Sequence, residues 1–236
     1  MTDARMAAPA SAGWLTGFLG EARAAITRRI LLPAAALLAV LTATNIVLLL
    51  NLPAPGERAG GVAVLAGAAR LAGLLVFLVP LVRILAGSRR PPWRPDGAFF
   101  LFAPFVILSL ALGAALILAF GDPFDPVRIA LRTAATTLIL SPLAPWIVGI
   151  VAAVPLGLSP TRFLRDFRLW LPPLLIWSLL LVTPVAWLHA VIDVALLQER
   201  VEWFWTAAVA DGLLSTLLVV LTYALYAAAY RRVARG

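Results

Sequence analysis

Six long apolar segments constrain the fold of this chain more than any other feature. Each is long enough to cross the hydrocarbon core of a bilayer, which takes roughly 20 apolar residues in a helix. They are Ile30–Asn51, Gly61–Ala86, Ala98–Phe120, Val127–Leu156, Leu169–Ile192 and Trp203–Tyr230. The composition agrees, since 63% of the 236 residues are hydrophobic and only 13% are charged, against about 25% charged in soluble domains. The sequence therefore predicts an all-α, polytopic transmembrane bundle of six spans.

The connections between these segments are short, and the predicted organisation is correspondingly simple. It comprises an N-terminal cytosolic segment over 1–29, a six-helix transmembrane domain over 30–230 and a basic cytosolic tail over 231–236. Apolar residues recur at helical spacing within the first segment, at Trp14, Leu15, Phe18, Leu19, Ala22 and Ile26. This stripe predicts an amphipathic helix lying at the membrane interface. A frayed N-terminus with a chance pattern is the alternative.

The charge balance of +8 comes entirely from arginine, because the chain holds 19 basic residues and no lysine. Alternating sides along six spans puts fourteen arginines on the side of the N-terminus: Arg5, Arg23, Arg28, Arg29, Arg83, Arg89, Arg90, Arg94, Arg162, Arg165, Arg168, Arg231, Arg232 and Arg235. The other side holds Arg58, Arg128, Arg132 and Arg200, and Arg70 lies inside a span. The positive-inside rule then predicts that both termini lie in the cytosol. Short arginine clusters favour anionic lipid as a partner over nucleic acid, which is not expected.

A few polar side chains fall inside the predicted spans, where ionisable groups are costly and are functional candidates by default. Arg70 lies nine residues from Gly61 and Asp211 eight residues from Trp203, so both sit roughly 12–14 Å along their helices. The other candidates occupy the same outer half of the bundle, and the predicted pocket comprises Arg70, Asp211, Arg132, Thr136, His189, Asp193 and Asn45.

Two interpretations of this pocket stay open. In the first, Arg70 and Asp211 pair within an outward-facing pocket that binds a solute. In the second, they form a buried ion pair that specifies helix packing and binds nothing. His189 and Asp193, four residues apart on one helix face, are expected to be an interfacial pair.

Several kinds of chemistry find no support in the sequence. The chain has no cysteine, which excludes thiolate metal, redox and nucleophile sites. The absence of lysine excludes a P-loop nucleotide site. A lone histidine lacks the ligand set of catalytic zinc, and paired intramembrane carboxylates for magnesium are missing. We therefore expect no metal, no cofactor and no enzymatic activity.

The segment Arg89–Pro95 links two predicted spans on the cytosolic side and cannot continue a helix. Its tryptophan and arginines suit the lipid headgroup region. The simplest interpretation is a short basic linker without a further function.

Three short motifs carry a resemblance to known proteins. They are the amphipathic start Trp14…Glu21-Ala-Arg23, the connection Pro155-Leu-Gly-Leu-Ser-Pro160…Arg165-Asp-Phe-Arg168-Leu-Trp170 and the ending Ala224-Leu-Tyr226…Arg231. With these the chain resembles the membrane domain that accompanies some glycerophosphodiester phosphodiesterases, and Yip-type membrane domains. The resemblance covers about a third of the chain and implies a membrane organiser. The phosphodiesterase domain has no counterpart here, so no catalytic residue carries over.

The sequence thus leads to two functional predictions. The first is a non-enzymatic accessory or organising component that packs against another membrane protein or a second copy of itself. Small-residue faces at Ala69/Gly73, Gly149/Ala153 and Ala224/Ala228 favour it. The second is a small transporter or channel subunit that uses the outer pocket for an anionic or zwitterionic solute.

Overall fold

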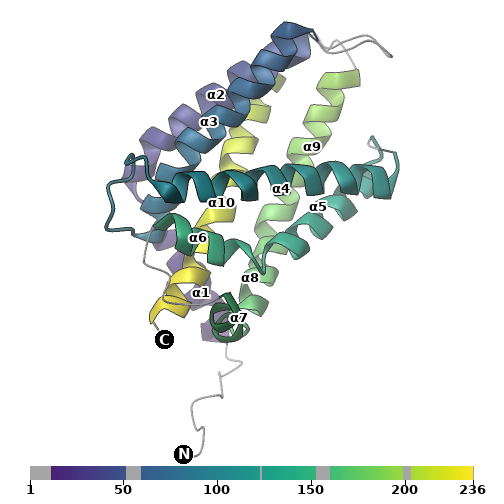
Figure 1. Ribbon diagram of the computed structural model, residues 1–236. Coiled ribbons are helices and arrows are strands. Elements are labelled where there is room, and N and C mark those ends of the chain that lie inside the picture. The colour runs from purple at the N-terminus through teal and green to yellow at the C-terminus, as the bar shows by residue number, and fades with distance from the viewer. Residues whose placement is uncertain (1–11, 52–59, 123, 153–159, 199–202, 236) are drawn as a thin grey trace, which may run out of the picture.

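The computed structural model describes residues 12–51, 60–122, 124–152, 160–198 and 203–235. Every regular element in these ranges is a helix (Figure 1). In chain order they are α1 (Ala12–Ala25), η1 (Arg28–Ile30), α2 (Leu31–Leu50), α3 (Gly61–Ala86), α4 (Gly97–Phe120), α5 (Pro126–Leu140), α6 (Ala144–Ala152), α7 (Pro160–Phe167), α8 (Leu171–Trp177), η2 (Ser178–Val182), α9 (Thr183–Gln198) and α10 (Phe204–Arg235).

Some predicted features lie outside the described residues. Three of them are segments: positions 1–11 at the N-terminus, residues 153–156 at the end of the fourth predicted span, and Pro155–Ser159 in the connection to the fifth predicted span. Three single arginines also lie outside, namely Arg5, Arg58 and Arg200.

The predicted all-α membrane bundle is confirmed. Five stretches are long and apolar enough to cross a membrane: Arg28–Leu50, Gly61–Ala86, Phe100–Phe120, Leu171–Leu197 and Phe204–Ala234. Their outward side chains are apolar, as lipid-facing side chains must be. Leu65 and Leu118, for example, are 72% and 85% exposed on the isolated chain.

The fourth predicted span differs from a single straight helix. It is broken at Ser141–Leu143 into α5 and α6, which are bent by 55° relative to each other. Pro142 lies at the break, where it cannot donate the backbone hydrogen bond that a continuous helix needs. The fifth span is also irregular, because a π-helical turn, η2, separates α8 from α9 just before Pro184.

The bent pair α5–α6 is apolar enough to count as a sixth span when its two helices are taken together. The end of α6 lies beside the end of α3, where Ser88 Oγ donates to the Ala152 carbonyl at 2.7 Å. The start of α5 lies beside α9, since Trp187 Nε1 donates to the Pro126 carbonyl at 3.1 Å. With this pair included, the described residues hold six candidate spans.

Helix α1 docks onto the last turns of α10, so both lie at one end of the bundle, here called the terminal end (Figure 1). Arg232 Nε lies 2.9 Å from Glu21 Oε2, and Arg231 Nη2 donates to the Glu21 carbonyl at 2.8 Å. The predicted apolar stripe lies on α1 and packs against the rest of the protein, since Phe18 and Ala22 are buried. Ile26, at its end, is 41% exposed. The residues expected to form a separate tail continue helix α10 as far as Arg235.

Helices α2, α3 and α10 form the centre of the bundle, with α9 packed against α10 and α4 lying across the other helices (Figure 1). Small residues allow the central helices to approach closely. A side chain at Gly73 would collide with Val40 of α2, and one at Gly212 would collide with Thr42 of α2. This close packing brings the polar residues of four helices together.

Candidate functional site

A cluster of polar side chains lies inside the bundle, toward the end opposite the terminal end. We call Asn45, Arg70, His189, Asp193, Asp211 and Ser215 the polar cluster. Its members come from α2, α3, α9 and α10, and lie about 8–17 Å along these helices from their far ends. The predicted common depth of the intramembrane polar residues therefore has a structural basis.

Asp211 is the centre of the polar cluster and is 1% exposed. Its two carboxylate oxygens have different partners. Asn45 Nδ2 donates to Oδ2 at 2.8 Å, and His189 Nδ1 lies 2.5 Å from Oδ1. A buried carboxylate is tolerated only when it is paired and hydrogen-bonded in this way.

The predicted direct pair between Arg70 and Asp211 does not form. Asn45 lies between them instead, because Arg70 Nη1 donates to Asn45 Oδ1 at 3.3 Å while the amide nitrogen of Asn45 binds Asp211. An amide can do this because it carries both an acceptor and donors. The two charges are thus bridged by a neutral residue of α2.

His189 also differs from its predicted partner. It pairs with Asp211 of α10 across the helix interface, and Ser215 Oγ lies 3.4 Å from the same Nδ1. The contact to Asp211 uses Nδ1, which leaves Nε2 as the second functional nitrogen of the ring. The His189 side chain is 21% exposed, which leaves part of the ring open.

Asp193 completes the polar cluster. It lies within electrostatic range of Asp211, His189 and Arg70, and it interacts with the side-chain amide of Asn45. Two carboxylates, one imidazole and one guanidinium therefore share a small volume inside the membrane-spanning region.

Two of the predicted pocket residues do not join the polar cluster. The Thr136 hydroxyl donates to the Arg132 carbonyl one turn earlier at 2.9 Å, which satisfies it within α5. Within the described ranges, no hydrogen bond or ion pair connects the Arg132 side chain to the polar cluster. Helix α5 packs mainly on α9 and α4.

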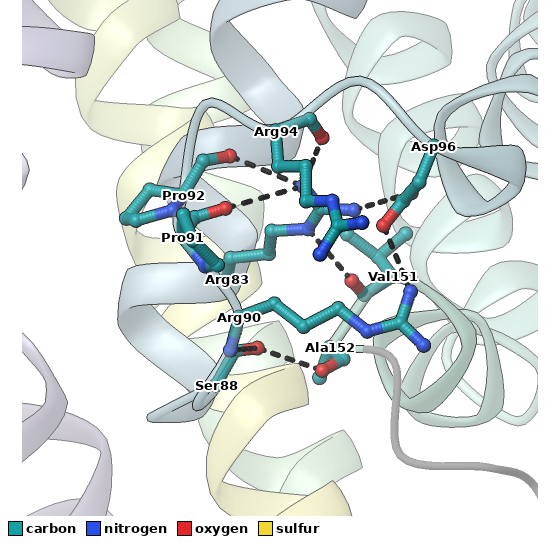
Figure 2. Close-up of polar contacts among 9 residues, drawn as sticks. All are labelled: Arg83, Ser88, Arg90, Pro91, Pro92, Arg94, Asp96, Val151 and Ala152. Atoms are coloured by element: carbon teal, nitrogen blue, oxygen red, sulfur yellow. Dashed lines mark hydrogen bonds and ion pairs between the residues drawn. The ribbon is translucent and has the colours of Figure 1, made fainter.

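A second buried charge, Arg83, was counted in the sequence only as an orientation signal. The structure makes it the centre of a network that fixes the linker between α3 and α4 (Figure 2). Arg83 is completely buried, and all three of its nitrogens donate. Nε binds the Val151 carbonyl at 3.0 Å, Nη1 reaches the carbonyls of Pro92 and Arg94 at 3.3 and 2.6 Å, and Nη2 pairs with Asp96 at 2.6 Å.

Neither cluster has the make-up of a metal centre. Among the residues that the structure describes, no group of three or more His, Asp or Glu side chains is placed to hold one ion. The polar cluster offers hydrogen-bond donors and acceptors and side chains of both charges.

Comparison with known proteins adds nothing to these observations. No protein-family model, curated protein or solved structure matches the chain. The function is therefore argued from the geometry of the polar cluster.

Proposed function

We propose that this protein is a small membrane transporter that binds an anionic or zwitterionic solute at the polar cluster. The observation that carries the proposal is the small number of protein contacts made by Arg70. It is an intramembrane arginine that is only partly buried, and its one hydrogen bond within the described residues is the 3.3 Å contact to Asn45.

Arg83 supplies the comparison within the same chain. A guanidinium has five N–H donors, and Arg83 directs them to backbone carbonyls and to Asp96 while being completely buried. That arrangement is what a structural arginine requires. Arg70 leaves most of its donors without a protein acceptor among the described residues, so it is available for the carboxylate or phosphate of a ligand.

The other members of the polar cluster complete a site for a zwitterion. Asp193 is partly exposed and lies in electrostatic range of Arg70. His189 Nε2 is directed away from the Asp211 contact, which uses Nδ1. A solute with a negative group at Arg70 and an amino group at Asp193 would find both charges matched. No covalent step is needed, which fits a role without catalysis.

The organising role predicted from small-residue faces remains the second candidate. Its basis is narrower than the sequence suggested, because Gly73 packs on Val40 inside the chain and Ala224 and Ala228 are buried at 2% and 0% exposure. These faces serve contacts within the bundle. Ala69, in contrast, is exposed, so a contact with another membrane protein could use that position.

For orientation, we assign the terminal end to the cytosol of a bacterial cell and the protein to its inner membrane. The support is the excess of arginines at that end, where Arg28, Arg29, Arg89, Arg90 and Arg94 lie close to span ends. The polar cluster then lies in the outer half of the membrane.

The proposal is tested with the purified full-length chain in detergent. Glutamate, glycine betaine, glycine and succinate are titrated as probes while thermal unfolding is followed. A probe at 100 times its dissociation constant would add about 2.7 kcal/mol of stability. Any probe that stabilises the protein is then offered in radiolabelled form to proteoliposomes, and its uptake is measured.

The decisive variant is Arg70→Gln, with Arg128→Gln as the matched loss of one charge outside the polar cluster. Arg128 is exposed and pairs with Asp125 outside the polar cluster. We expect Arg70→Gln to abolish both probe stabilisation and uptake while unfolding at the same temperature as the wild type without probe. If it unfolds at a much lower temperature and no probe stabilises the wild type, the polar cluster is a packing device.

A further inference from the structure

A cavity at the terminal end is separate from the polar cluster. Its volume is about 830 Å³, and it lies between the end of α1, the 3₁₀ turn η1, the end of α3 with its linker, and Arg231 of α10. We call it the arginine cavity. The linker that forms one wall is the segment drawn in Figure 2.

The lining of the arginine cavity is strongly basic. Five arginines line it, namely Arg29, Arg83, Arg89, Arg90 and Arg231, and no carboxylate is among the residues that line it. Asp96, outside the lining, balances part of this charge by pairing with Arg83 and Arg90 at 2.6 and 2.8 Å. Arg29 and Arg89 are exposed and have no ion pair within the described part of the chain. The cavity therefore has a net positive field that an anion would neutralise.

The wall of the cavity is held in place before any ligand arrives. Gly87 turns the chain at the end of α3 with φ of 68°, a conformation that glycine adopts without strain. Ser88 Oγ then donates to Ala152 of α6 and accepts from the backbone N–H of Arg90 at 3.1 Å. Together with the Arg83 network, these bonds fix the backbone that carries Arg89 and Arg90. Such preorganisation reduces the entropy cost of binding.

The surroundings of the cavity favour a lipid over a soluble anion. Trp93, which also lines it, is 46% exposed, as expected of a tryptophan at headgroup level. Arg29 is followed along the chain by Leu31 and Leu32, which are 64% and 67% exposed. A headgroup held by Arg29 would thus have apolar surface close by for its acyl chains.

We propose that the arginine cavity binds the phosphate of an anionic phospholipid headgroup. Guanidinium groups bind phosphate oxygens in bidentate fashion, and Arg29 and Arg89 carry the donors that the protein itself does not use. This proposal is independent of solute binding at the polar cluster. It assigns a function to the linker that the sequence alone presented as a plain basic connection.

The test follows thermal unfolding of the full-length chain in a neutral detergent. Phosphatidylglycerol, phosphatidylcholine and inorganic phosphate are titrated separately. The variant is Arg29→Gln/Arg89→Gln. The control is Arg28→Gln/Arg94→Gln, which removes two charges at the same end from residues that do not line the cavity. Both variants are first compared with the wild type in phosphatidylcholine, where equal unfolding temperatures show that they fold.

We expect phosphatidylglycerol to stabilise the wild type and the control variant at the same concentration. The Arg29→Gln/Arg89→Gln variant should need about thirtyfold more lipid for the same shift, from the loss of two arginine–lipid contacts. Inorganic phosphate giving the same shift with the same variant dependence would keep the phosphate site and overturn its assignment to lipid. Equal losses in the two variants, or no effect of phosphatidylglycerol on the wild type, would overturn the proposal.

Discussion

At the scale of single residues, two arginines inside one chain show opposite ways of carrying a buried charge. Removing a guanidinium from water costs several kcal/mol unless it is paired and its donors are satisfied. Arg83 meets this cost with an ion pair to Asp96 and with carbonyls of a proline-rich linker and of α6. Arg70 has only Asn45 within the described residues, which is why we assign a ligand to it.

The first prediction concerns Arg83. Replacing it with Met keeps most of the side-chain volume but leaves Asp96 and several carbonyls without their donor. Because this breaks a buried pair, we expect Arg83→Met to lower the free energy of unfolding by about 3–5 kcal/mol. Unfolding by SDS titration in mixed micelles measures it, and faster proteolysis within residues 87–96 should accompany the loss.

Arg90→Gln is the control for this prediction. Arg90 pairs with the same Asp96, but its side chain is 43% exposed, and exposed pairs contribute about 0.2–1 kcal/mol. Equal losses of stability for Arg83→Met and Arg90→Gln would show that the network around Arg83 does not hold the linker.

The sequence predicted the depth of the polar residues but not their partners. Depth follows from counting along helices, so Asn45, Arg70, His189 and Asp211 could be placed at one level. Partners depend on how the helices are rotated and spaced. The position of Asn45 between Arg70 and Asp211 therefore could not be predicted from the sequence. For Arg83 one signal existed, because the successive prolines Pro91 and Pro92 keep this segment out of a helix and leave its carbonyls outside helical hydrogen bonding.

At the scale of elements, the spacing of the helices is set by a few small residues. Gly212 of α10 faces Thr42 of α2, and an added Cβ would lie 3.0 Å from Thr42 Cβ and 3.4 Å from its Cα. Thr42 Cβ does not move when its side chain rotates about χ1, so rotation of the side chain alone does not relieve the 3.0 Å approach. This approach also positions Asp211, the residue before Gly212 on α10, against Asn45.

The second prediction is that Gly212→Ala lowers the free energy of unfolding by about 1–3 kcal/mol, the usual cost of overpacking. Gly67→Ala in α3 is the matched control, because a Cβ there meets nothing within 4 Å. That change should be neutral or stabilising by up to about 1 kcal/mol through helix propensity. Chemical unfolding of both variants in the same detergent checks the difference. A similar effect of the two substitutions would contradict close packing of α2 on α10.

Elements were predictable wherever composition alone determines them. The predicted span Gly61–Ala86 coincides with α3. The first, third and sixth predicted spans begin and end within a few residues of α2, α4 and α10. The break between α5 and α6 was not predicted, although Pro142 was visible in the sequence. Proline is tolerated inside other spans, as Pro80 is in α3 and Pro104 in α4. A bend of 55° at Pro142 therefore depends on the packing of α6 against α3, α4 and α10.

At the scale of the whole molecule, the docking of α1 on α10 constrains the topology. Glu21 and Arg232 are joined by an ion pair of 2.9 Å, so the first and last described helices meet at one end of the bundle. A chain whose two ends lie on one side of a membrane must cross it an even number of times. The five unbroken spans alone would give an odd number, so we expect the bent pair α5–α6 to complete a sixth crossing.

The third prediction tests this parity by single-cysteine labelling, for which the chain has no cysteine background. Gly20→Cys in α1, Phe124→Cys at the turn before α5 and Ala234→Cys at the end of α10 are all at exposed positions. With the terminal end in the cytosol, a membrane-impermeant maleimide should label only Phe124→Cys in intact spheroplasts. All three variants should react once the membrane is disrupted.

Six crossings require Gly20→Cys and Ala234→Cys to behave alike, so labelling of one without the other would mean that α5 and α6 do not cross together. Labelling of both without Phe124→Cys would keep the six crossings and reverse the orientation.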